Sequence, residues 1–221
     1  MSKSYIPVIA IDGPSASGKG TVAQIVANNL GYHYLDSGAL YRIVALAALE
    51  KGVDWQAEEA IAKLVPQLNI AFAQGEIYLN NSNVSERIRT EKIGQGASQV
   101  AAHPMVRLAL VNLQHSFRQT PGLVADGRDM ASVIFPDATV KIFLTATAEV
   151  RAERRYKQLV SKGQKADYQK ILMDLQDRDT RDTNRATSPL IPDPEASLLE
   201  TSELTVEEAV NIVQATLLKN V

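Results

Sequence analysis

The stretch that decides the fold is Gly13–Thr21, which reads GPSASGKGT. It follows an apolar segment, Tyr5–Asp12, that predicts a short buried strand, and it precedes a helical pattern over Thr21–Leu30. A loop of the form G-x-x-x-x-G-K between a strand and a helix is typical of a phosphate-binding loop. Its N–H groups would point at phosphate oxygens, the helix N-terminus would add positive charge, and Lys19 would reach the outer phosphates. The candidate phosphate ligands are therefore Gly13, Pro14, Ser15, Ala16, Ser17, Gly18, Lys19, Gly20 and Thr21.

Outward from this loop, short apolar segments alternate with helical patterns. The further strands that we predict are Tyr32–Asp36, Leu123–Asp126, Val140–Leu144 and Ser197–Leu204. The further predicted helices are Gly38–Lys51, Ala57–Leu68 (disturbed at Pro66), Glu91–Ala102, Met105–Gln119, Glu149–Lys162, Tyr168–Ala186 and Val206–Leu218, and Asn69–Ser85 suggests a small hairpin around Gln74–Gly75. This alternation predicts an α/β fold with a parallel sheet covered on both faces, which binds ligands at the carboxyl ends of its strands.

Composition excludes several classes of protein. The 221 residues are 45% hydrophobic and 22% charged, which is ordinary globular usage. The absence of cysteine excludes disulfides, zinc thiolate sites, iron–sulfur clusters and cysteine nucleophiles. The three histidines lie far apart, which does not favour a histidine-built metal site, and the net charge of −2 argues against general nucleic-acid binding. With no targeting or membrane-spanning pattern in view, we expect a cytoplasmic protein without a membrane partner.

The positive charge gathers in one part of the chain. Residues Arg151–Arg185 hold six arginines and four lysines against one glutamate and five aspartates, a local charge of +4. A local cationic surface on an acidic protein suggests a small anionic ligand. The alternative is a solvated helical face laced with ion pairs.

Polar residues follow two further strands and suggest an acceptor site. Asp36–Arg42 reads DSGALYR, and Ala125–Asp129 reads ADGRD. Arg42 and Arg128 would then converge at the strand ends, where guanidinium groups can hold an acceptor phosphate. The alternative for Asp36–Arg42 is a helix cap at Asp36 and Ser37 followed by an exposed arginine.

A second cluster lies in the predicted helix Tyr168–Ala186. The offsets of Arg178, Arg181, Asp182 and Arg185 predict that all four share one helical face. The alternative interpretation is that Arg178 and Asp182 form a routine surface ion pair of little energetic value.

Taken in order, six segments resemble the bacterial cytidylate kinase family: IDGPSASGKGT, LDSGALYR, ASQVAAHPMVR, ADGRDM, VKIFL and DRDTRDTNRA. The resemblance runs from about Ile9 to the last predicted strand. It implies a P-loop kinase fold with a five-stranded parallel sheet flanked by helices, as a single domain over residues 1–221. It also implies a monophosphate-binding insert at residues 54–89 and a mobile lid at residues 148–168.

The family resemblance implies an activity as well. It is ATP-dependent phosphorylation of CMP and dCMP to CDP and dCDP by direct phosphoryl transfer, with Mg²⁺, by a monomer whose partners are small-molecule nucleotides and not nucleic acid. The implied catalytic residues are Lys19, Arg42, Arg128 and Arg185, and Gly13–Thr21 would bind the ATP phosphates. The implied substrate-binding residues are Ser37, Arg42, Ser98, Arg107, Arg128, Asp129, Arg178, Asp182 and Arg185.

Within that set the resemblance implies separate roles. Arg42, Arg128 and Arg185 would clamp the CMP phosphate, and Arg178 and Asp182 would face the ribose. Ser98, Arg107 and Asp129 would read the cytosine, with Ser37 nearby. The lid would carry Arg151, Arg154 and Arg155.

The implied chemistry suits these residue types. A carboxylate can accept from the cytosine amino group, and a guanidinium can donate to the ring acceptors, so Asp129 and Arg107 are a fitting pair. Transfer to a phosphate oxygen needs positioning and charge stabilisation more than a general base. Gly20 stands where a Ser or Thr hydroxyl usually touches Mg²⁺, so phosphates and waters would hold the metal, with Asp36 and Asp126 as candidates to bind those waters.

Three rival interpretations can be compared with the sequence. Another small-molecule P-loop kinase should lack the cytosine-reading residues. A non-catalytic nucleotide-binding switch of the GTPase type would need an N-K-x-D segment, which the sequence lacks. An ATPase or motor would need an acidic residue directly after the strand-end aspartate, but Gly127 follows Asp126.

Overall fold

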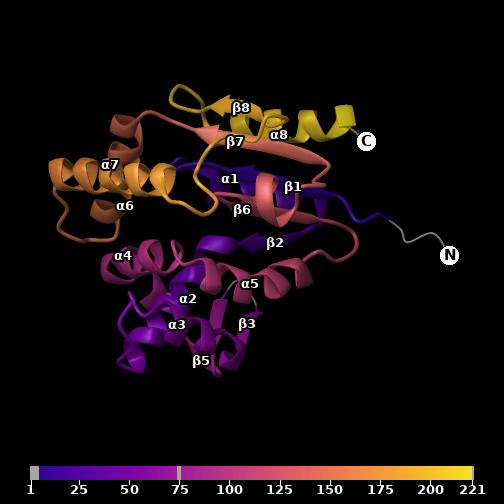
Figure 1. Cartoon of the computed structure of the whole chain (residues 1–221). Helices are drawn as coiled ribbons and strands as arrows, with labels where there is room; N and C mark the ends of the chain where they lie inside the picture. Colours follow the sequence, from indigo (N-terminus) through magenta and orange to yellow (C-terminus); the bar gives the residue numbers. More distant parts are fainter. Residues whose placement is uncertain (1–4, 74–75, 221) are drawn as a thin grey trace. The chain divides into compact units, whose positions relative to one another are not determined.

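The computed structural model describes residues 5–73 and 76–220, and it contains a five-stranded sheet in the order β2-β6-β1-β7-β8 (Figure 1). Strand β1 pairs in parallel with β6 on one side and β7 on the other, and β7 pairs in parallel with β8. The predicted parallel α/β sheet is confirmed. Its strands are β1 (Val8–Asp12), β2 (His33–Asp36), β6 (Leu123–Gly127), β7 (Val140–Thr145) and β8 (Ser197–Glu200).

Helices α1 (Lys19–Leu30) and α8 (Val206–Asn220) cover one face of this sheet. The face is made by alternate strand residues such as Ile9, Ile11 and Ile142, which pack with Val26 of α1 and Val213 of α8 in one buried cluster. The intervening strand residues are fully buried as well, since both Val8 and Ala10 are 0% exposed. Burial on both faces explains why the strands read as continuous apolar runs and not as alternating ones.

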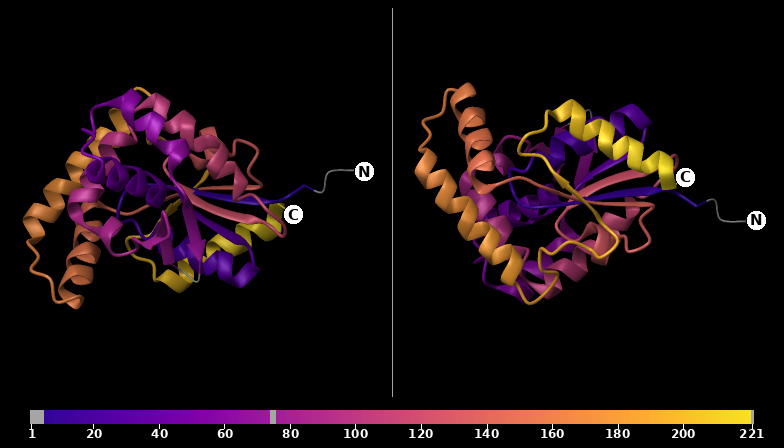
Figure 2. Two further views of the ribbon diagram at one scale, coloured as in Figure 1. Left: turned by 90° about the horizontal axis from the view of Figure 1, so that it is seen from below. Right: turned by 90° about the horizontal axis from the view of Figure 1, so that it is seen from above.

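Helices α6 (Ala148–Ser161) and α7 (Tyr168–Asn184) lie side by side as a helical hairpin (Figure 2). Thr147 caps α6 by accepting from the amide of Val150, and Asp167 caps α7 by accepting from the amide of Lys170. The prediction that α7 continues to Ala186 was wrong. Its backbone becomes extended at Arg185, with ψ 142°, so Arg185 does not share a helical face with Asp182.

A single turn of π-helix, Met130–Ile134, follows β6 and was not predicted. Its hydrogen bonds run from the amide of Ile134 to the carbonyl of Asp129 and from the amide of Phe135 to that of Met130. We refer to Met130–Ile134 as the π turn. Such turns are frequent at functional sites.

The chain divides into two compact units. The first contains the five-stranded sheet and runs to Leu35, then resumes at His115, and the second is the continuous stretch Asp36–Gln114. Elements of the second unit are α2 (Ser37–Glu50), α3 (Glu58–Leu64), α4 (Glu91–Val100), most of α5 (Pro104–Ser116), β3 (Ile70–Ala73), β4 (Glu76–Leu79) and β5 (Ser82–Asn83).

The predicted hairpin of the second unit is confirmed, because β3 and β4 pair in antiparallel register with Ile70 opposite Leu79. Its expected turn at Gln74–Gly75 lies outside the described residues. A third strand, β5, was not predicted, because its two residues are too few to show a pattern. The predicted cap at Asp36 is confirmed, since its Oδ1 accepts from the amide of Ala39 at 2.9 Å.

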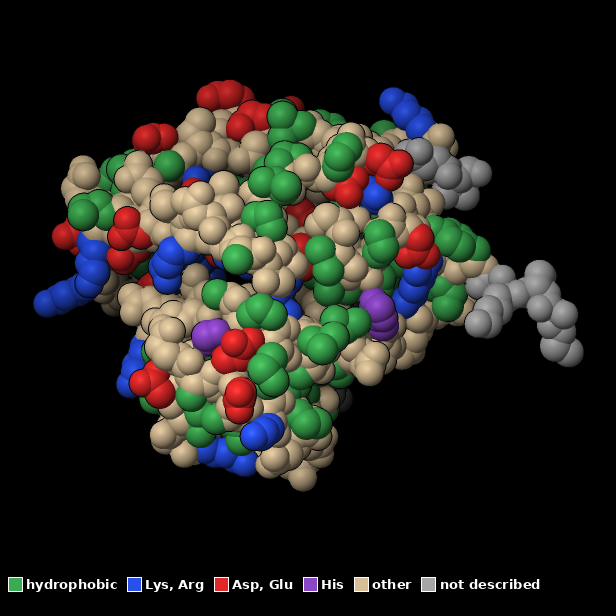
Figure 3. All heavy atoms as spheres, viewed as in Figure 1, with side chains coloured by type: hydrophobic (Ala, Val, Ile, Leu, Met, Phe, Trp, Pro, Cys, Tyr) green, Lys and Arg blue, Asp and Glu red, His purple; other side chains and the backbone are tan. Residues whose placement is uncertain are grey.

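Among the described residues, no helix is both long and apolar enough to cross a membrane, and no group of three or more His, Asp or Glu side chains could hold a metal ion. The face drawn in Figure 3 carries basic, acidic and apolar side chains interspersed with one another. The net charge of −2 is the difference between 23 basic and 25 acidic residues in the whole chain.

Gly96 of α4 provides a test of packing in the second unit, because a Cβ there would lie 2.5 Å from the Trp55 ring. We expect Gly96→Ala to lower the free energy of unfolding by about 1–3 kcal/mol, since the overlap outweighs the better helix propensity of alanine. Urea unfolding followed by circular dichroism measures the change. The control is Gln95→Ala on the exposed side of the same helix, expected within about 0.5 kcal/mol of the parent. A Gly96→Ala variant as stable as the control would contradict the close packing.

Candidate functional site

The loop Gly13–Thr21 wraps around the Lys19 side chain. A Cβ on Gly13 would lie 1.9 Å from the Leu144 carbonyl oxygen, and φ at Gly18 is +95°, so both positions require glycine. Lys19 is 8% exposed and donates from Nζ to the Pro14 carbonyl at 3.2 Å. The ammonium group is thus held inside the loop, in the position from which it can meet a bound phosphate.

Two arginines of α6 hold this loop from outside. Arg151 donates to the Ser15 carbonyl at 3.1 Å, and Arg154 donates to the Ser17 carbonyl at 3.0 Å. Carbonyl groups that are bonded in this way leave the loop's N–H groups to face a ligand. Both arginines belong to the segment expected to form the lid.

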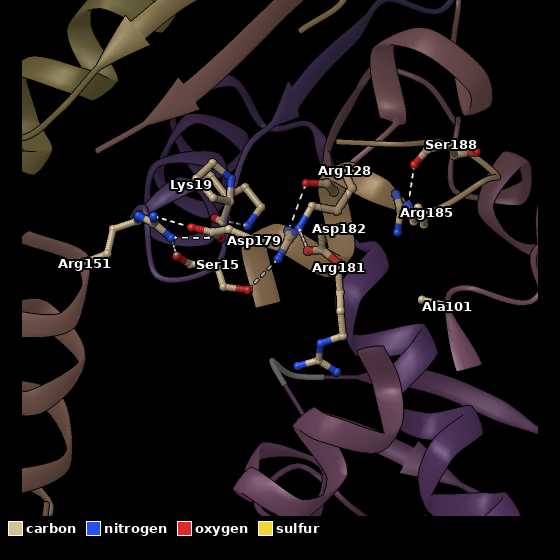
Figure 4. A network of polar contacts seen from close by, with 12 residues as sticks. Ser15, Lys19, Ala101, Arg128, Arg151, Asp179, Arg181, Asp182, Arg185 and Ser188 are labelled. Atoms are coloured by element: carbon tan, nitrogen blue, oxygen red, sulfur yellow. Dashed lines mark hydrogen bonds and ion pairs between the residues drawn. The ribbon is translucent and has the colours of Figure 1, made fainter. Parts of the chain in front are cut away.

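Arg128, directly after β6, connects the phosphate loop to α7 (Figure 4). Its Nη2 donates to Ser15 Oγ at 2.7 Å, and its Nε donates to Asp182 Oδ2 at 2.9 Å. The alternative interpretation of Asp182, a routine surface ion pair with Arg178, does not describe it, because Asp182 is 6% exposed and pairs with Arg128.

Electrostatics around Asp182 favour its ionised form. Burial alone would raise the pKa of its carboxyl, but the charges of Arg128, Arg178 and Arg185, with the hydrogen bond from Arg128, hold that pKa below its usual value. Asp182 is therefore an anion at neutral pH and compensates the cations that surround it.

Sequence reasoning did not identify Asp179, which forms the second ion pair of this network. Both of its carboxylate oxygens accept from Arg151, at 3.1 and 2.5 Å. Only three positions separate Asp179 from Asp182, and the two side chains neutralise different arginines of the site. A bidentate pair of this kind, formed by a buried arginine and a partly buried aspartate, fixes α6 against α7.

Asp12, the last residue of β1, has a role that the motifs did not indicate. Its Oδ1 accepts from the amide of Met130 and its Oδ2 from the amide of Ala131, both at 2.8 Å. Burial raises its pKa to about 7, even though these two hydrogen bonds act in the opposite direction. The signal available in the sequence was the place of Asp12 at a strand end before the loop, but its partners lie more than a hundred residues away.

At the neighbouring strand end, Asp126 lies beside the start of α1. Its Oδ2 accepts from the Tyr34 hydroxyl at 2.8 Å, and a Cβ on Gly20 would lie 3.1 Å from the same oxygen. Gly20 therefore leaves the room that Asp126 occupies. This is a physical reason for the unusual glycine in the loop.

The predicted substrate residues of the second unit are tied to that unit's own backbone. Arg42 donates to the Ile88 carbonyl at 2.8 Å, and Arg107 donates to the Ala101 carbonyl at 3.0 Å while lying 5.5 Å above the Tyr41 ring. Ser98 Oγ is buried with no hydrogen-bond partner in the described part of the chain. Ser37 is also buried, at the start of α2. Because Arg42 and Arg128 belong to different units, their convergence stays a prediction.

The remaining predicted residues lie at or beyond the end of α7. Arg178 contributes to the field at Asp182, and Arg185 bonds through Nε to the Ser188 carbonyl in the extended segment. Arg181 is exposed and donates to the Asp177 carbonyl of its own helix at 3.4 Å, so nothing ties it to this network.

A cleft of about 490 Å³ adjoins the phosphate loop in the first unit. Gly18 and Thr21 line its loop side, Arg154 lines the side of α6, and Leu204 and Ala209 line the side of β8 and α8. A cleft of this size with a mixed apolar and polar lining is suited to a small molecule such as a nucleoside.

Comparison with known proteins supplies the family. A family model described as "Cytidylate kinase" matches residues 9–219. The cytidylate kinase of Polynucleobacter asymbioticus is 60% identical over 210 residues, which are 95% of this chain and 96% of that protein. The cytidylate kinase of Burkholderia vietnamiensis is 56% identical over 207 residues, which are 94% of this chain and 91% of that protein.

A solved structure supports the fold independently. The crystal structure of a gluconokinase from Sinorhizobium meliloti aligns with 96% of this chain and 92% of its own, with a TM-score of 0.50 at 14% identity. At that identity the likeness concerns the fold alone. The family model and the relatives, each matched over nearly its whole length, place this chain in the cytidylate kinase family.

Proposed function

We propose that the chain transfers the γ-phosphoryl group of ATP to CMP and dCMP, forming CDP and dCDP. The observation that carries the proposal is the position of Arg128, which bonds to Ser15 of the phosphate loop and directly precedes Asp129, the candidate base reader. The Arg128 guanidinium thus links the loop that would bind the donor phosphates to the segment that would bind the acceptor nucleotide. Membership of the cytidylate kinase family supports the same substrate pair.

On the donor side, Gly13–Thr21 bind the phosphates of ATP and the adjoining cleft takes its nucleoside. The size of the cleft and its position beside Gly18 and Thr21 support this assignment. Arg151, Arg154 and Arg155 lie on the lid, residues 148–168, which closes over the phosphates and excludes water. Lys19 stabilises the charge on the transferring group.

On the acceptor side, Asp129 accepts from the cytosine amino group while Arg107 and Ser98 serve the ring acceptors, with Ser37 nearby. The buried Ser98 Oγ supports this role, because a buried hydroxyl without a protein partner is satisfied when a ligand binds it. Uracil has a carbonyl where cytosine has the amino group, so the Asp129 carboxylate would repel it.

The phosphate of CMP is held by Arg42, Arg128 and Arg185, and its ribose by Arg178 and Asp182. Guanidinium groups suit this task because they bind phosphate through paired hydrogen bonds and stabilise the transition state of phosphoryl transfer. In the present structure Asp182 already neutralises Arg128, so the acceptor phosphate adds to a charge-balanced network and does not meet isolated cations.

Magnesium fits this site as an ion held by phosphates and waters. The Asp126 carboxylate lies beside the start of α1, and the space beside Gly20 admits it where other phosphate loops place a hydroxyl. We propose that Asp126 binds magnesium-bound water and that Tyr34 orients its carboxylate, with Asp36 as a further candidate. When bound, the metal neutralises the charge of the donor phosphates.

We further propose that residues 54–89 act as the monophosphate-binding insert of a single kinase domain over residues 1–221. The protein acts as a monomer in the cytoplasm, on small-molecule nucleotides and not on nucleic acid. The family model, which matches residues 9–219 without a break, supports the single kinase domain.

A screen of nucleoside mono- and diphosphates for ATP-dependent turnover tests the function. CMP and dCMP should be the best acceptors. Equal turnover of purine monophosphates, or turnover only of a non-nucleotide acceptor, would favour another small-molecule P-loop kinase. Nucleotide binding without turnover would favour a switch.

The first prediction concerns Lys19. Lys19→Met should lower kcat by roughly 100-fold or more, because the lost charge acts in the transition state, and it should leave the fold intact. Steady-state kinetics and thermal melting measure the two effects. Lys51→Met, at an exposed helix end, is the matched control and should retain kcat within about twofold. Near-normal kcat in folded Lys19→Met would exclude the proposed role of the loop.

The second prediction concerns base choice at Asp129. Asp129→Asn keeps the shape but presents an amide N–H₂ to the uracil oxygen, so the preference for CMP over UMP should shrink by about 1–3 kcal/mol. The ratio of kcat/KM for the two nucleotides measures it. Asp137→Asn, in an exposed ion pair with Arg118, is the control and should leave the ratio unchanged. If Asp129→Asn keeps the wild-type ratio, Asp129 does not read the base.

The third prediction concerns magnesium. Asp126→Asn should raise the Mg²⁺ concentration needed for half-maximal activity by about tenfold, because the variant loses the charge that attracts metal-bound water. Tyr34→Phe removes only the orienting hydroxyl and should give a smaller rise in the same direction. Titration of activity with MgCl₂ at fixed ATP measures both. An unchanged magnesium requirement in Asp126→Asn would remove Asp126 from the site.

A further inference from the structure

Asp12 caps a helical turn that begins far away in the sequence. The amides of Met130 and Ala131 are the first two of the π turn, and they have no partners within it. The Asp12 carboxylate accepts from both, one amide to each oxygen. It is 4% exposed, so these bonds are shielded from water.

Asp129 stands at the position from which a residue normally caps its own helix. An aspartate there would usually accept from the second or third amide of the turn. Here the Asp129 side chain makes no capping hydrogen bond, and Asp12 supplies the cap in its place. Asp12 therefore holds the start of the turn directly after Asp129, from a strand that lies far away in the sequence.

The position of Asp12 also ties this turn to the phosphate loop. Asp12 pairs with Gly127 across β1 and β6 and immediately precedes Gly13. Asp126 pairs with Ile11, so the side chains of Asp12 and Asp126 point to opposite faces of the sheet. Asp126, the candidate for binding magnesium-bound water, and Asp12, which caps the π turn, therefore lie on different faces of the sheet and have different roles.

We propose that Asp12 is a positioning residue for acceptor recognition, whose carboxylate holds the π turn so that Arg128 and Asp129 keep their register with the phosphate loop. This inference rests on the proposed function, because it assumes that Asp129 reads the base. It assigns Asp12 no contact with either nucleotide.

The protonation state of Asp12 makes the proposal testable. Burial is the main cause that raises its pKa to about 7, and the negative charge of Asp129 adds to this rise. The hydrogen bonds from Ala131 and Met130 and the positive charge of Arg128 act in the opposite direction. Protonation turns one acceptor oxygen into a hydroxyl, so the double cap requires the ionised form.

Other titratable groups near the turn are already bonded. Lys141 of β7 shares the sheet face of Asp12 but pairs with Asp193 and Glu195, and His115 contacts the Ile134 carbonyl at the far end of the turn. The experiment therefore separates the effect of Asp12 from that of the His115 imidazole.

The effects of Asp12 on stability and on function have opposite signs. Because its pKa is raised from 3.8, the stability that it contributes is present below about pH 4 and is lost as pH rises through about 7. Capping, by contrast, improves as pH rises through the same range. Asp12→Asn removes the buried charge, so we expect its melting temperature at pH 8 to stay within about 4 °C of wild type.

The experiment compares Asp12→Asn with wild type at pH 8 and pH 6. At pH 8, kcat/KM for CMP should fall about tenfold, KM for ATP should stay within about twofold, and the preference for CMP over UMP should shrink. At pH 6, where wild-type Asp12 is itself mostly protonated, the difference between the two proteins should narrow to about twofold. The contribution of His115 is the same in both proteins and cancels in the comparison.

Asp126→Asn is the matched control, with the same chemical change at the neighbouring strand end but on the other sheet face. It should change the magnesium requirement and leave the CMP-over-UMP preference as in wild type. The proposal would be overturned if folded Asp12→Asn kept the wild-type preference for CMP over UMP and the wild-type KM for CMP. It would also be overturned if the loss of kcat/KM for CMP were equal at both pH values. A wild-type protein with no preference for CMP would instead contradict the proposed function.

If Asp12→Asn does not fold, the wild-type protein decides the question alone. Its CMP-over-UMP ratio should fall between pH 8 and pH 6, because the phosphates of the two nucleotides titrate alike and cancel. His115→Gln removes the imidazole beside the turn and should keep this fall. The role of Asp12 would be overturned if the CMP-over-UMP ratio of the wild-type protein did not change with pH. It would also be overturned if the ratio no longer changed with pH in His115→Gln.

Discussion

The parallel pairing of β1 with β6 is the constraint on which the first unit depends. The ladder runs from Val8 opposite Leu123 to Asp12 opposite Gly127, so the two strands end level with each other. The loop after β1 and the turn after β6 therefore start from the same edge of the sheet. A slip of one residue would turn every side chain to the other face. It would put Asp12 among the apolar groups that pack with α1 and α8, away from the amides of Met130 and Ala131.

Buried arginines and aspartates convert this alignment into a fixed network. Two aspartates of α7 neutralise these arginines: Asp182 pairs with Arg128, which follows β6, and Asp179 pairs with Arg151 of α6. Both arginines also donate to Ser15, Arg128 to its hydroxyl and Arg151 to its carbonyl. Removal of one partner would leave a buried charge uncompensated, which is far more destabilising than loss of a surface pair.

Local patterns in the sequence predicted the sheet and the phosphate loop. The apolar run before Gly13 and the glycines of the loop depend on short-range rules, which hold whatever the rest of the chain does. The cap at Asp36 was predictable for the same reason. The motifs also indicated Arg128 and Asp182 as site residues, but the only ion-pair partner they offered for Asp182, in the alternative interpretation, was Arg178. The true partner is separated from Asp182 by 54 positions.

Contacts between distant segments account for what the sequence did not reveal. The π turn has no periodic pattern of its own and is completed by Asp12, and Asp179 acquires its role only when α6 lies beside α7. The end of α7 was misjudged because helical spacing continues through Arg185, whereas its Nε bonds to the Ser188 carbonyl beyond the helix. Tertiary contacts of this kind override local propensity.

The division of the chain into a continuous unit and an interrupted one has a consequence for biosynthesis. Asp36–Gln114 is a single stretch, so all of its contacts become possible as soon as that stretch has left the ribosome. Strand β1 lies between β6 and β7, and so it waits for partners that are translated more than a hundred residues later. During synthesis the apolar N-terminal strand is therefore exposed while the middle of the chain folds. Of the two units, the one that carries the phosphate loop has the higher contact order and the greater need for protection from aggregation.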